Sequence, residues 1–222
     1  MEFTELIYKI FIKDSGWLTI LNGLWVTVQI SALSLLFGTL LGSLMCFFRM
    51  SKFKPLKIFA QIYISIIRGS PVLMLLMLLF YGVFARTGIN PLLVAVITFS
   101  MHTAAHVAEL LRSALMALDK GQLEAARTLG FSEFQAFKLV TLPQLARIAK
   151  PVYQSTVVNL IQWTSVVGYV TITDLTRVIN NIAARTMQPM ITIIGGLIIY
   201  LSISYLVYGI FFLSERGEKN DN

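Results

Sequence analysis

Residues 124–144, EAARTLGFSEFQAFKLVTLPQ, form a charged segment between strongly apolar runs of a 222-residue chain. The first of these residues are good helix formers, and Gly130 suits the left-handed position that ends a helix. Ser132 follows as a favourable N-cap for a second helix, and Pro143 is expected to break or redirect that helix. The sequence therefore predicts two short helices joined by a tight bend. Such an element can dock in a groove of a partner, and a plain solvated connection is the alternative.

The residues on either side of this segment place the chain in a membrane. Hydrophobic residues make up 56% of the sequence and charged residues 13%, which is too little polar surface for an ordinary soluble domain. A single cysteine, Cys46, excludes an intrachain disulfide and a multi-cysteine metal cluster. The net charge of +7 comes from basic residues at the ends of apolar segments. This distribution is typical of a membrane protein whose basic residues set its orientation, and it does not indicate a nucleic-acid partner.

Five apolar stretches are long enough to cross a bilayer as α-helices, which takes about 20 residues each. We therefore expect an all-α membrane protein with about five transmembrane helices. Gly38 and Gly42 in the first stretch, and Gly195 and Gly196 in the last, permit the close approach of neighbouring helices. The expected spans lie near residues 21–48, 58–84, 91–118, 152–172 and 190–213.

The basic residues between these stretches predict the orientation of the chain. By the positive-inside rule, the central loop at residues 119–150 and the C-terminus are cytoplasmic, and the N-terminus is external. The predicted cytoplasmic loops carry Arg49, Lys52, Lys54, Lys57, Lys120, Arg127, Lys138, Arg147 and Lys150, and the opposite side carries Lys9, Lys13, Arg86, Arg177 and Arg185.

The N-terminal residues do not have the pattern of a cleavable signal, because acidic Glu2 and Glu5 stand where a basic region is required. Residues 1–19 are instead expected to form an external amphipathic segment on the membrane interface. We find no repeat and no linker, which predicts one membrane domain over residues 1–222. The sequence also has no P-loop, so any ATP hydrolysis must come from another polypeptide.

Several motifs in fixed order resemble one family of membrane proteins. They are NGLWVTVQIS, YISIIRGSPVLMLLMLLFYG, AAHVAELLRSAL, KGQLEAARTLG, TLPQLARIAKP and WTSVVGYVTITDL, and they cover residues 22–175. Together they resemble the polar amino-acid uptake subfamily of ABC importer permeases, the EAA-loop family that includes histidine and glutamine permeases. This resemblance implies the type I importer permease fold.

The resemblance also implies roles and partners. The chain would form the pathway of a polar amino acid through the bacterial inner membrane as a multi-pass subunit that is not itself an enzyme. It would hold no cofactor, because a partner ABC ATPase dimer binds ATP and Mg. An extracytoplasmic substrate-binding protein and a second permease, either a copy or a paralogue, complete the expected assembly. The residues implied in ATPase coupling are Gly121, Gln122, Glu124, Ala125, Ala126, Gly130, Leu142 and Pro143.

The run Arg68-Gly69-Ser70-Pro71 is the first of three candidates for contact with the substrate. An arginine inside a span costs about 3 kcal/mol on insertion scales, so Arg68 should face protein or water. Gly69 and Pro71 are expected to interrupt the helix, and the freed backbone groups at Ser70 could line a cavity. The alternative is a kink in which Arg68 pairs with Glu109 or another acid.

The second candidate is the run Gln162-Trp163-Thr164-Ser165. The family it resembles often has Lys-Asp or Lys-Ser before the Thr-Ser pair, and this chain has Gln-Trp instead. Gln162, Thr164 and Ser165 therefore remain candidate contacts for a solute whose identity stays open. Hydrogen bonds between helices are the alternative role of these side chains.

The third candidate is His102, His106 and Glu109, which share one helix face. A metal site, a pH-sensitive cluster and simple packing are each compatible with this spacing. The chain lacks the HExxH motif, and we predict neither a catalytic residue nor a metal ligand. Two other functions remain as alternatives: an intramembrane metal-dependent hydrolase that uses these three residues, and a secondary carrier or channel.

Overall fold

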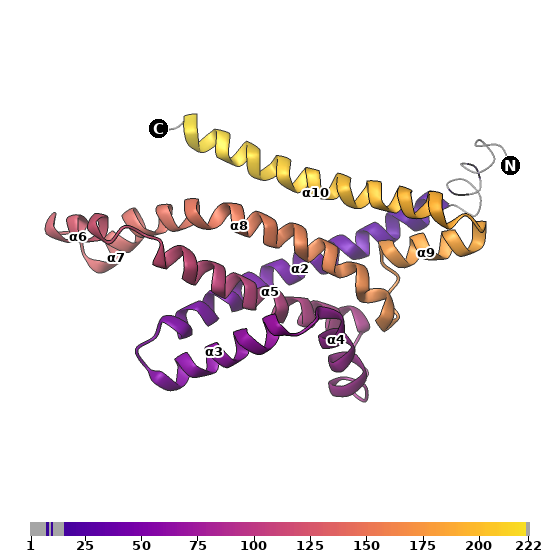
Figure 1. Cartoon of the computed structure of the whole chain (residues 1–222), viewed down its shortest axis with the longest axis horizontal. Helices are drawn as coiled ribbons and strands as arrows, with labels where there is room; N and C mark the ends of the chain where they lie inside the picture. Colours follow the sequence, from indigo (N-terminus) through magenta and orange to yellow (C-terminus); the bar gives the residue numbers. More distant parts are fainter. Residues whose placement is uncertain (1–7, 9, 11–15, 221–222) are drawn as a thin grey trace. The chain divides into compact units, whose positions relative to one another are not determined.

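The computed structural model describes residues 8, 10 and 16–220, and the elements within these residues are all helical (Figure 1). In chain order they are α2 (Gly16–Met50), α3 (Lys54–Gly69), α4 (Val72–Met77), the π-helix η3 (Leu78–Val83), α5 (Pro91–Met116), α6 (Lys120–Thr128), α7 (Glu133–Ala136), the π-helix η4 (Phe137–Thr141), α8 (Leu142–Trp163), the 3₁₀-helix η5 (Thr164–Val170), α9 (Leu175–Thr186) and α10 (Pro189–Asn220). The amphipathic segment expected at residues 1–19 lies for the most part outside the described residues.

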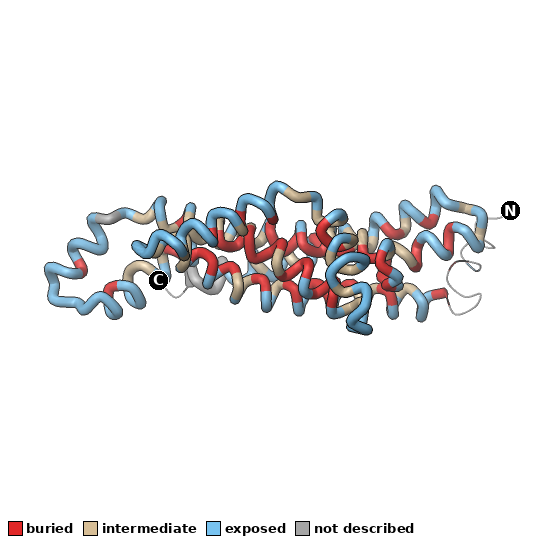
Figure 2. Tube along the Cα trace, turned by 90° about the horizontal axis from the view of Figure 1, so that it is seen from below, coloured by how far each residue is buried: buried red, intermediate tan, exposed pale blue. Residues whose placement is uncertain are grey.

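The chain divides into two compact units. Unit 1 contains the chain up to Leu36, Ser70–Ser100 and the chain from Val157 onward. Unit 2 contains Phe37–Gly69 and Met101–Thr156. Figure 2 shows the buried residues along the helices. The single domain expected over residues 1–222 stays a prediction.

Unit 1 packs around a core to which α2, α4, α5, α8 and η5 all contribute. Ile30, Leu76 and Phe99 are fully buried there. The hydroxyl oxygen of Thr27, on α2, accepts a hydrogen bond of 3.2 Å from the backbone N–H of Leu175 at the start of α9. This bond satisfies a donor at a helix start, where no intrahelical partner exists. Helix α9 also packs against α10.

Unit 2 has two small cores, which share α5. The first joins α2, α3 and α5, and the second joins α5 to α8. Gly42 lies where α2 meets α5: a Cβ atom at this position would lie 2.7 Å from Val107 Cβ and 2.8 Å from the carbonyl oxygen of Ala104. The close helix approach expected at Gly42 is therefore confirmed. It is also confirmed at Gly196, where a Cβ atom would meet the side chain of Ile179, and it is wrong at Gly195, where a Cβ atom would meet nothing within 4 Å.

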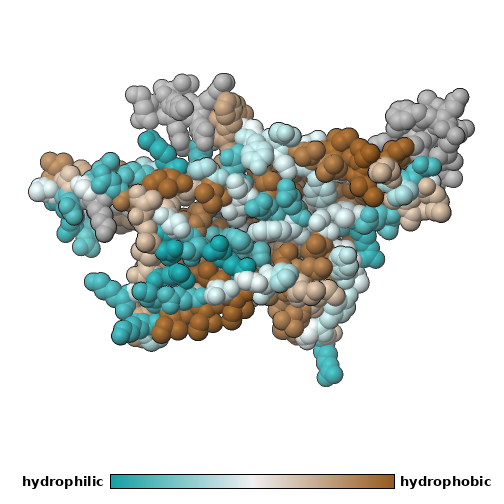
Figure 3. Space-filling view, viewed as in Figure 1, coloured by the Kyte–Doolittle hydropathy of each residue, from teal (hydrophilic) through white to brown (hydrophobic). Residues whose placement is uncertain are grey.

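Three of the described helices, α2, α5 and α10, are long and apolar enough to cross a membrane, and the broken helix α3 with α4 and η3 makes a fourth if it counts as one span. Figure 3 shows apolar side chains over part of α10. The interruption expected at Gly69 and Pro71 is confirmed, because α3 ends at Gly69 and α4 begins at Val72. The count of five spans and the orientation stay predictions.

The span expected at residues 152–172 is not a single α-helix. Helix α8 begins at Leu142, and the backbone changes to the 3₁₀-helix η5 at Thr164. The early start brings Arg147 and Lys150 into the helix, which lowers its hydropathy. The apolar pattern could not locate either end of the helix. At its N-terminal end α8 includes polar residues before position 152, and at its C-terminal end the backbone tightens to a 3₁₀-helix within the apolar run.

Candidate functional site

The segment that precedes α8 begins with α6, whose two ends are capped. Asp119 is the N-cap, and its Oδ1 accepts a hydrogen bond of 2.9 Å from the backbone N–H of Gly121. At the other end, Gly130 has a φ of +89°, and the N–H of Phe131 donates to the carbonyl of Ala126 at 3.2 Å. The left-handed glycine that the sequence predicts at Gly130 is confirmed, and it reverses the chain within a few residues.

The second short helix, α7, begins with a full capping box. The hydroxyl of Ser132 accepts from the N–H of Gln135 at 3.2 Å, and the Gln135 side chain accepts from the N–H of Ser132 at 2.9 Å. The N-cap expected at Ser132 is confirmed, and the reciprocal bond completes it. The break expected at Pro143 is wrong: α8 begins one residue earlier and continues. Pro143 lies in the first turn of α8, where its missing N–H leaves no bond unmade.

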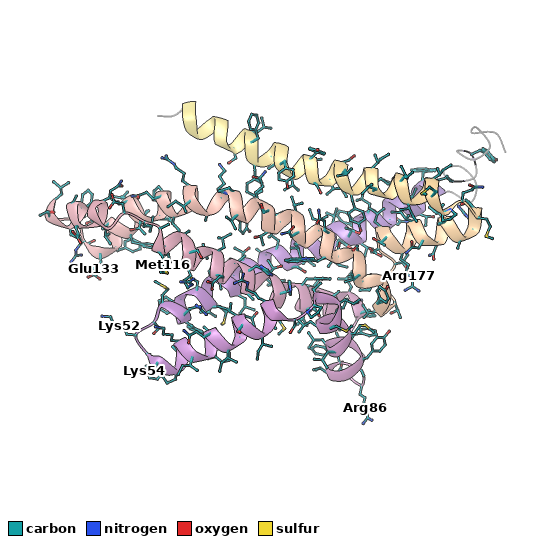
Figure 4. The ribbon with its side chains drawn as sticks, in the orientation of Figure 1. Lys52, Lys54, Arg86, Met116, Glu133 and Arg177 are labelled. Atoms are coloured by element: carbon teal, nitrogen blue, oxygen red, sulfur yellow. The ribbon has the colours of Figure 1, made fainter. Side chains whose placement is uncertain are left out.

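The surface of this segment is rich in exposed apolar side chains. Leu129 is 78% exposed and Phe134 is 72% exposed. Glu124 is exposed, whereas Ala126 is buried. The side chain of Gln144 donates to that of Gln122 at 2.7 Å, which ties α6 to the start of α8. The sequence-predicted coupling residues therefore lie together in α6, in the bend after it and in the first turn of α8; Glu133, at the start of α7, is labelled in Figure 4.

A cavity of about 380 Å³ in unit 2 brings together Arg68, His106 and Glu109, the residues predicted from two different candidate runs. Glu109 also binds two arginines: its Oε1 accepts from Arg112 Nε at 3.0 Å, and its Oε2 lies 3.7 Å from Arg49. Arg68 lines the same cavity, but the ion pairs among the described residues do not include one between Arg68 and Glu109, so the alternative pairing with this acid is not borne out. Arg49 and Arg112 already flank the carboxylate.

The two histidines do not gather into a metal site with Glu109. The rings of His102 and His106 have their centroids 5.0 Å apart. Within residues 8, 10 and 16–220, no group of three histidine, cysteine or acidic side chains is placed to hold a metal ion. Because Glu109 is held by Arg112 and Arg49, the structure does not favour the metal-dependent hydrolase.

The run Gln162–Ser165 lies at the junction of α8 and η5, in unit 1. Gln162 and Ser165 line a cavity of about 250 Å³ with Tyr200 and other residues of α10. Thr164 is fully buried, and its hydroxyl donates to the carbonyl of Ile161 at 2.6 Å. Two of the three predicted side chains thus face a cavity, and the third is engaged with its own helix.

A second polar cluster, which is not among the three candidates predicted from the sequence, lies at the start of α9. Asp174 is fully buried and caps this helix: its carboxylate accepts from the N–H of Arg177 at 3.0 Å and of Thr176 at 3.1 Å. Burial raises the pKa of Asp174 above its ordinary value, and the bonds from these two N–H groups oppose that rise. The hydroxyl of Thr176 lies 2.9 Å from that of Tyr200 on α10. The run Asp-Leu-Thr-Arg begins with a favourable N-cap residue, and this sequence pattern could have predicted the start of a helix here.

Comparison with known proteins finds matches over most of the chain. The family described as binding-protein-dependent transport system inner membrane component matches residues 34–220. The L-cystine transport system permease protein TcyB of Bacillus subtilis (strain 168) is 32% identical over 203 residues, which cover 91% of this chain and 84% of that protein. The glutamate/aspartate import permease protein GltK of Escherichia coli O6:H1 is 31% identical, over 83% of this chain and 88% of that protein.

Solved structures match as well. An amino acid ABC transporter crystallised with histidines has a chain with a TM-score of 0.83 and 28% identity, and the match covers 97% of this chain and 98% of that one. The inward-facing MetNI methionine ABC transporter gives a TM-score of 0.74 at 18% identity, over 93% of this chain and 99% of that one. The second likeness shows the fold alone.

Proposed function

This chain belongs to the family of binding-protein-dependent transport system inner membrane components, and from that premise we propose that it forms the pathway of a polar amino acid through the bacterial inner membrane. It is a permease subunit of the ABC importer class and not itself an enzyme. Relatives named for the transport of cystine and of glutamate and aspartate, each more than 30% identical, support an amino acid as the solute.

The observation that carries this proposal is the shape of the segment from Asp119 to Pro143. Two short helices are capped by side chains of their own sequence, so the backbone groups at their first turns are satisfied without a partner. It presents the exposed side chains of Leu129 and Phe134, which an isolated chain has no reason to leave in water. A groove on a partner would bury them, as helix-in-groove recognition does. We assign that groove to the ATPase.

Coupling then works by a shift of population. ATP binding closes the ATPase dimer, and the docked segment transmits this closure to α8, whose first turn carries Leu142 and Pro143. The bond between Gln144 and Gln122 keeps α6 attached to α8 during the motion. The nucleotide drives transport because it binds one state of the assembly better than the other. A substrate-binding protein delivers the solute, and a second permease completes the pathway.

The cavity at Arg68, His106 and Glu109 and the cavity at Gln162 and Ser165 are the proposed solute contacts within the chain. Gly69, Ser70 and Pro71 support the first, because the break between α3 and α4 frees backbone groups near Arg68. Thr164, between the two side chains that line the second cavity, is buried and supports it through its bond to Ile161. ATP and Mg belong to the partner ATPase in this proposal.

Glu124→Arg tests the coupling assignment. The chain is co-expressed with its ATPase, reconstituted in nanodiscs, and assayed for copurification and ATP hydrolysis. We expect a loss of about tenfold or more in stimulated ATPase activity and loss of the complex, because the change reverses the charge of an exposed side chain on the proposed docking segment. Arg86→Glu is the control: it also reverses one charge, at an exposed residue in the turn before α5 and outside the docked segment, and should leave the complex intact. A fully active Glu124→Arg complex would overturn the coupling assignment.

A further inference from the structure

A polar cavity in unit 1 has no role in the assignments above. It has a volume of about 350 Å³ and is lined by η5 and α9. This volume lies within the range of small-molecule sites. Figure 4 labels Arg177 near the start of α9. The lining residues are Ser165, Gly168, Tyr169, Thr176, Arg177 and Asn180.

Arg177 is held in place at both of its ends. Its backbone N–H donates to Asp174 Oδ1 at 3.0 Å, and one guanidinium nitrogen, Nη1, donates to the carbonyl oxygen of Gly168 at 2.9 Å. The guanidinium has five N–H donors and stays charged at any physiological pH. No ion pair among the described side chains includes Arg177. The cavity thus contains a positioned cation with donors to spare.

The neighbours of Arg177 leave its charge uncompensated on the cavity side. The Asp174 carboxylate is fully buried and is engaged with the N–H groups that open α9, so it positions the arginine. Gly168 lies over the arginine stem: a Cβ atom there would lie 3.6 Å from Arg177 Cβ and 3.8 Å from its Cδ. A longer side chain at position 168 would enter the cavity. Ser165 and Asn180 add neutral polar groups to the wall.

A carboxylate is the chemical group that fits this arrangement. Its two oxygens match the parallel N–H donors of a guanidinium, and bonds of this kind are about twice as strong as neutral ones. Ser165 borders this cavity and also the one at Gln162 and Tyr200. The bond between Thr176 and Tyr200 joins the two walls. A molecule with its carboxylate at Arg177 would therefore have its remaining atoms beside the second cavity.

We propose that Arg177 binds the α-carboxylate of the transported amino acid, with the solute side chain in the adjoining cavity at Gln162 and Tyr200. This inference rests on the proposed function and adds a specificity-determining residue to it. The α-carboxylate is common to all amino acids, so Arg177 would recognise the class. The cavity at Gln162 would distinguish its members.

Binding to the permease–ATPase complex in nanodiscs, without the binding protein, tests the proposal. Labelled L-arginine, L-glutamate, L-cystine and L-histidine serve as separate probes, and the tightest is competed with its own α-carboxamide. In the unaltered complex the carboxamide should compete about 10- to 100-fold more weakly than the acid, because it cannot form the charged pair. Arg177→Gln should weaken binding of the acid by a similar factor and remove most of this preference.

Two further variants separate local from general effects. Arg185→Gln removes the same charge from the last turn of the same helix and should change neither affinity nor preference. Gly168→Leu should fill the cavity and weaken binding while Arg177 is intact. An Arg177→Gln complex that folds, hydrolyses ATP and keeps the preference for the acid would overturn this inference alone. An unaltered complex that binds and transports none of the probes would overturn this inference and the amino-acid assignment together.

Discussion

The two charged cavities of this chain differ in how their arginines are used. In unit 2, Glu109 forms ion pairs with Arg49 and Arg112, and it lines the cavity that also holds Arg68 and His106. In unit 1, the guanidinium of Arg177 donates to a backbone carbonyl, and no ion pair among the described residues includes it. An ion pair between helices resists separation, whereas a cation held only by a neutral group can still accept an anion. Glu109 therefore has a structural role in addition to lining its cavity, whereas Arg177 keeps donors for the carboxylate proposed above.

The largest effect should come from breaking the ion pairs in unit 2. Glu109→Gln leaves Arg49 and Arg112 without the carboxylate that pairs with both of them. We expect a loss of about 3 kcal/mol, the lower end of the range for breaking a buried pair, because both partners keep partial exposure. The apparent melting temperature of the purified complex in detergent measures it.

Glu133→Gln is the control for this change. Its carboxylate also lies 3.7 Å from an arginine, Arg127, but is 90% exposed. The melting temperature should stay unchanged, because pairs in water contribute little. Equal losses in the two variants would contradict the structural role of Glu109.

A smaller effect should come from the contact between α2 and α5 at Gly42. Gly42→Val places atoms where Val107 and the carbonyl of Ala104 already lie, so α2 must move away from α5. Overpacking of this kind costs about 1 to 3 kcal/mol. The same melting assay measures it, and Gly195→Val, at a position where a Cβ would meet nothing within 4 Å, is the control. A Gly42→Val complex as stable as the original would contradict the close contact between α2 and α5 as a source of stability.

The smallest effect should come from the cap that positions Arg177. Asp174→Ala removes the acceptor for two N–H groups at the start of α9 and should cost about 1 kcal/mol. Asp174→Asn keeps an acceptor oxygen and should recover most of the loss. Both can be compared by thermal unfolding at neutral pH. If alanine and asparagine behave alike, the cap does not stabilise α9.

The Asp174 carboxyl also predicts a pH dependence. Burial raises its pKa in the folded chain above the ordinary value of 3.8, so the folded state binds the proton more tightly than the unfolded state. The free energy of unfolding should therefore gain a contribution as the pH falls through the raised pKa. This gain is complete once the pH is below 3.8. Asp174→Asn removes the titrating group, so the difference in melting temperature between the two proteins should shift in favour of the original at low pH. A constant difference would contradict the raised pKa.

The sequence correctly predicts helix ends and helix caps whose hydrogen-bond partners lie within a few residues along the chain. Gly130 ends α6 in the left-handed conformation, and Ser132 caps α7, because both depend on backbone groups in the same turn. The interruption at Gly69 and Pro71 is local for the same reason. The helix break expected at Pro143 does not occur, because proline breaks a helix in its interior and is tolerated in the first turn. Pro143 lies in the first turn of α8 because the π-helix η4 ends just before it.

By itself, the sequence determined the membrane as the solvent of this chain, the capped segment that begins at Asp119, and the break between α3 and α4. These follow from composition and from bonds between near neighbours. Only the tertiary structure decided that Glu109 pairs with Arg49 and not with Arg68, and that Arg177 faces a cavity with Ser165. The physical reason is that such contacts join side chains from different helices, and helix packing sets which of several available charges come within range.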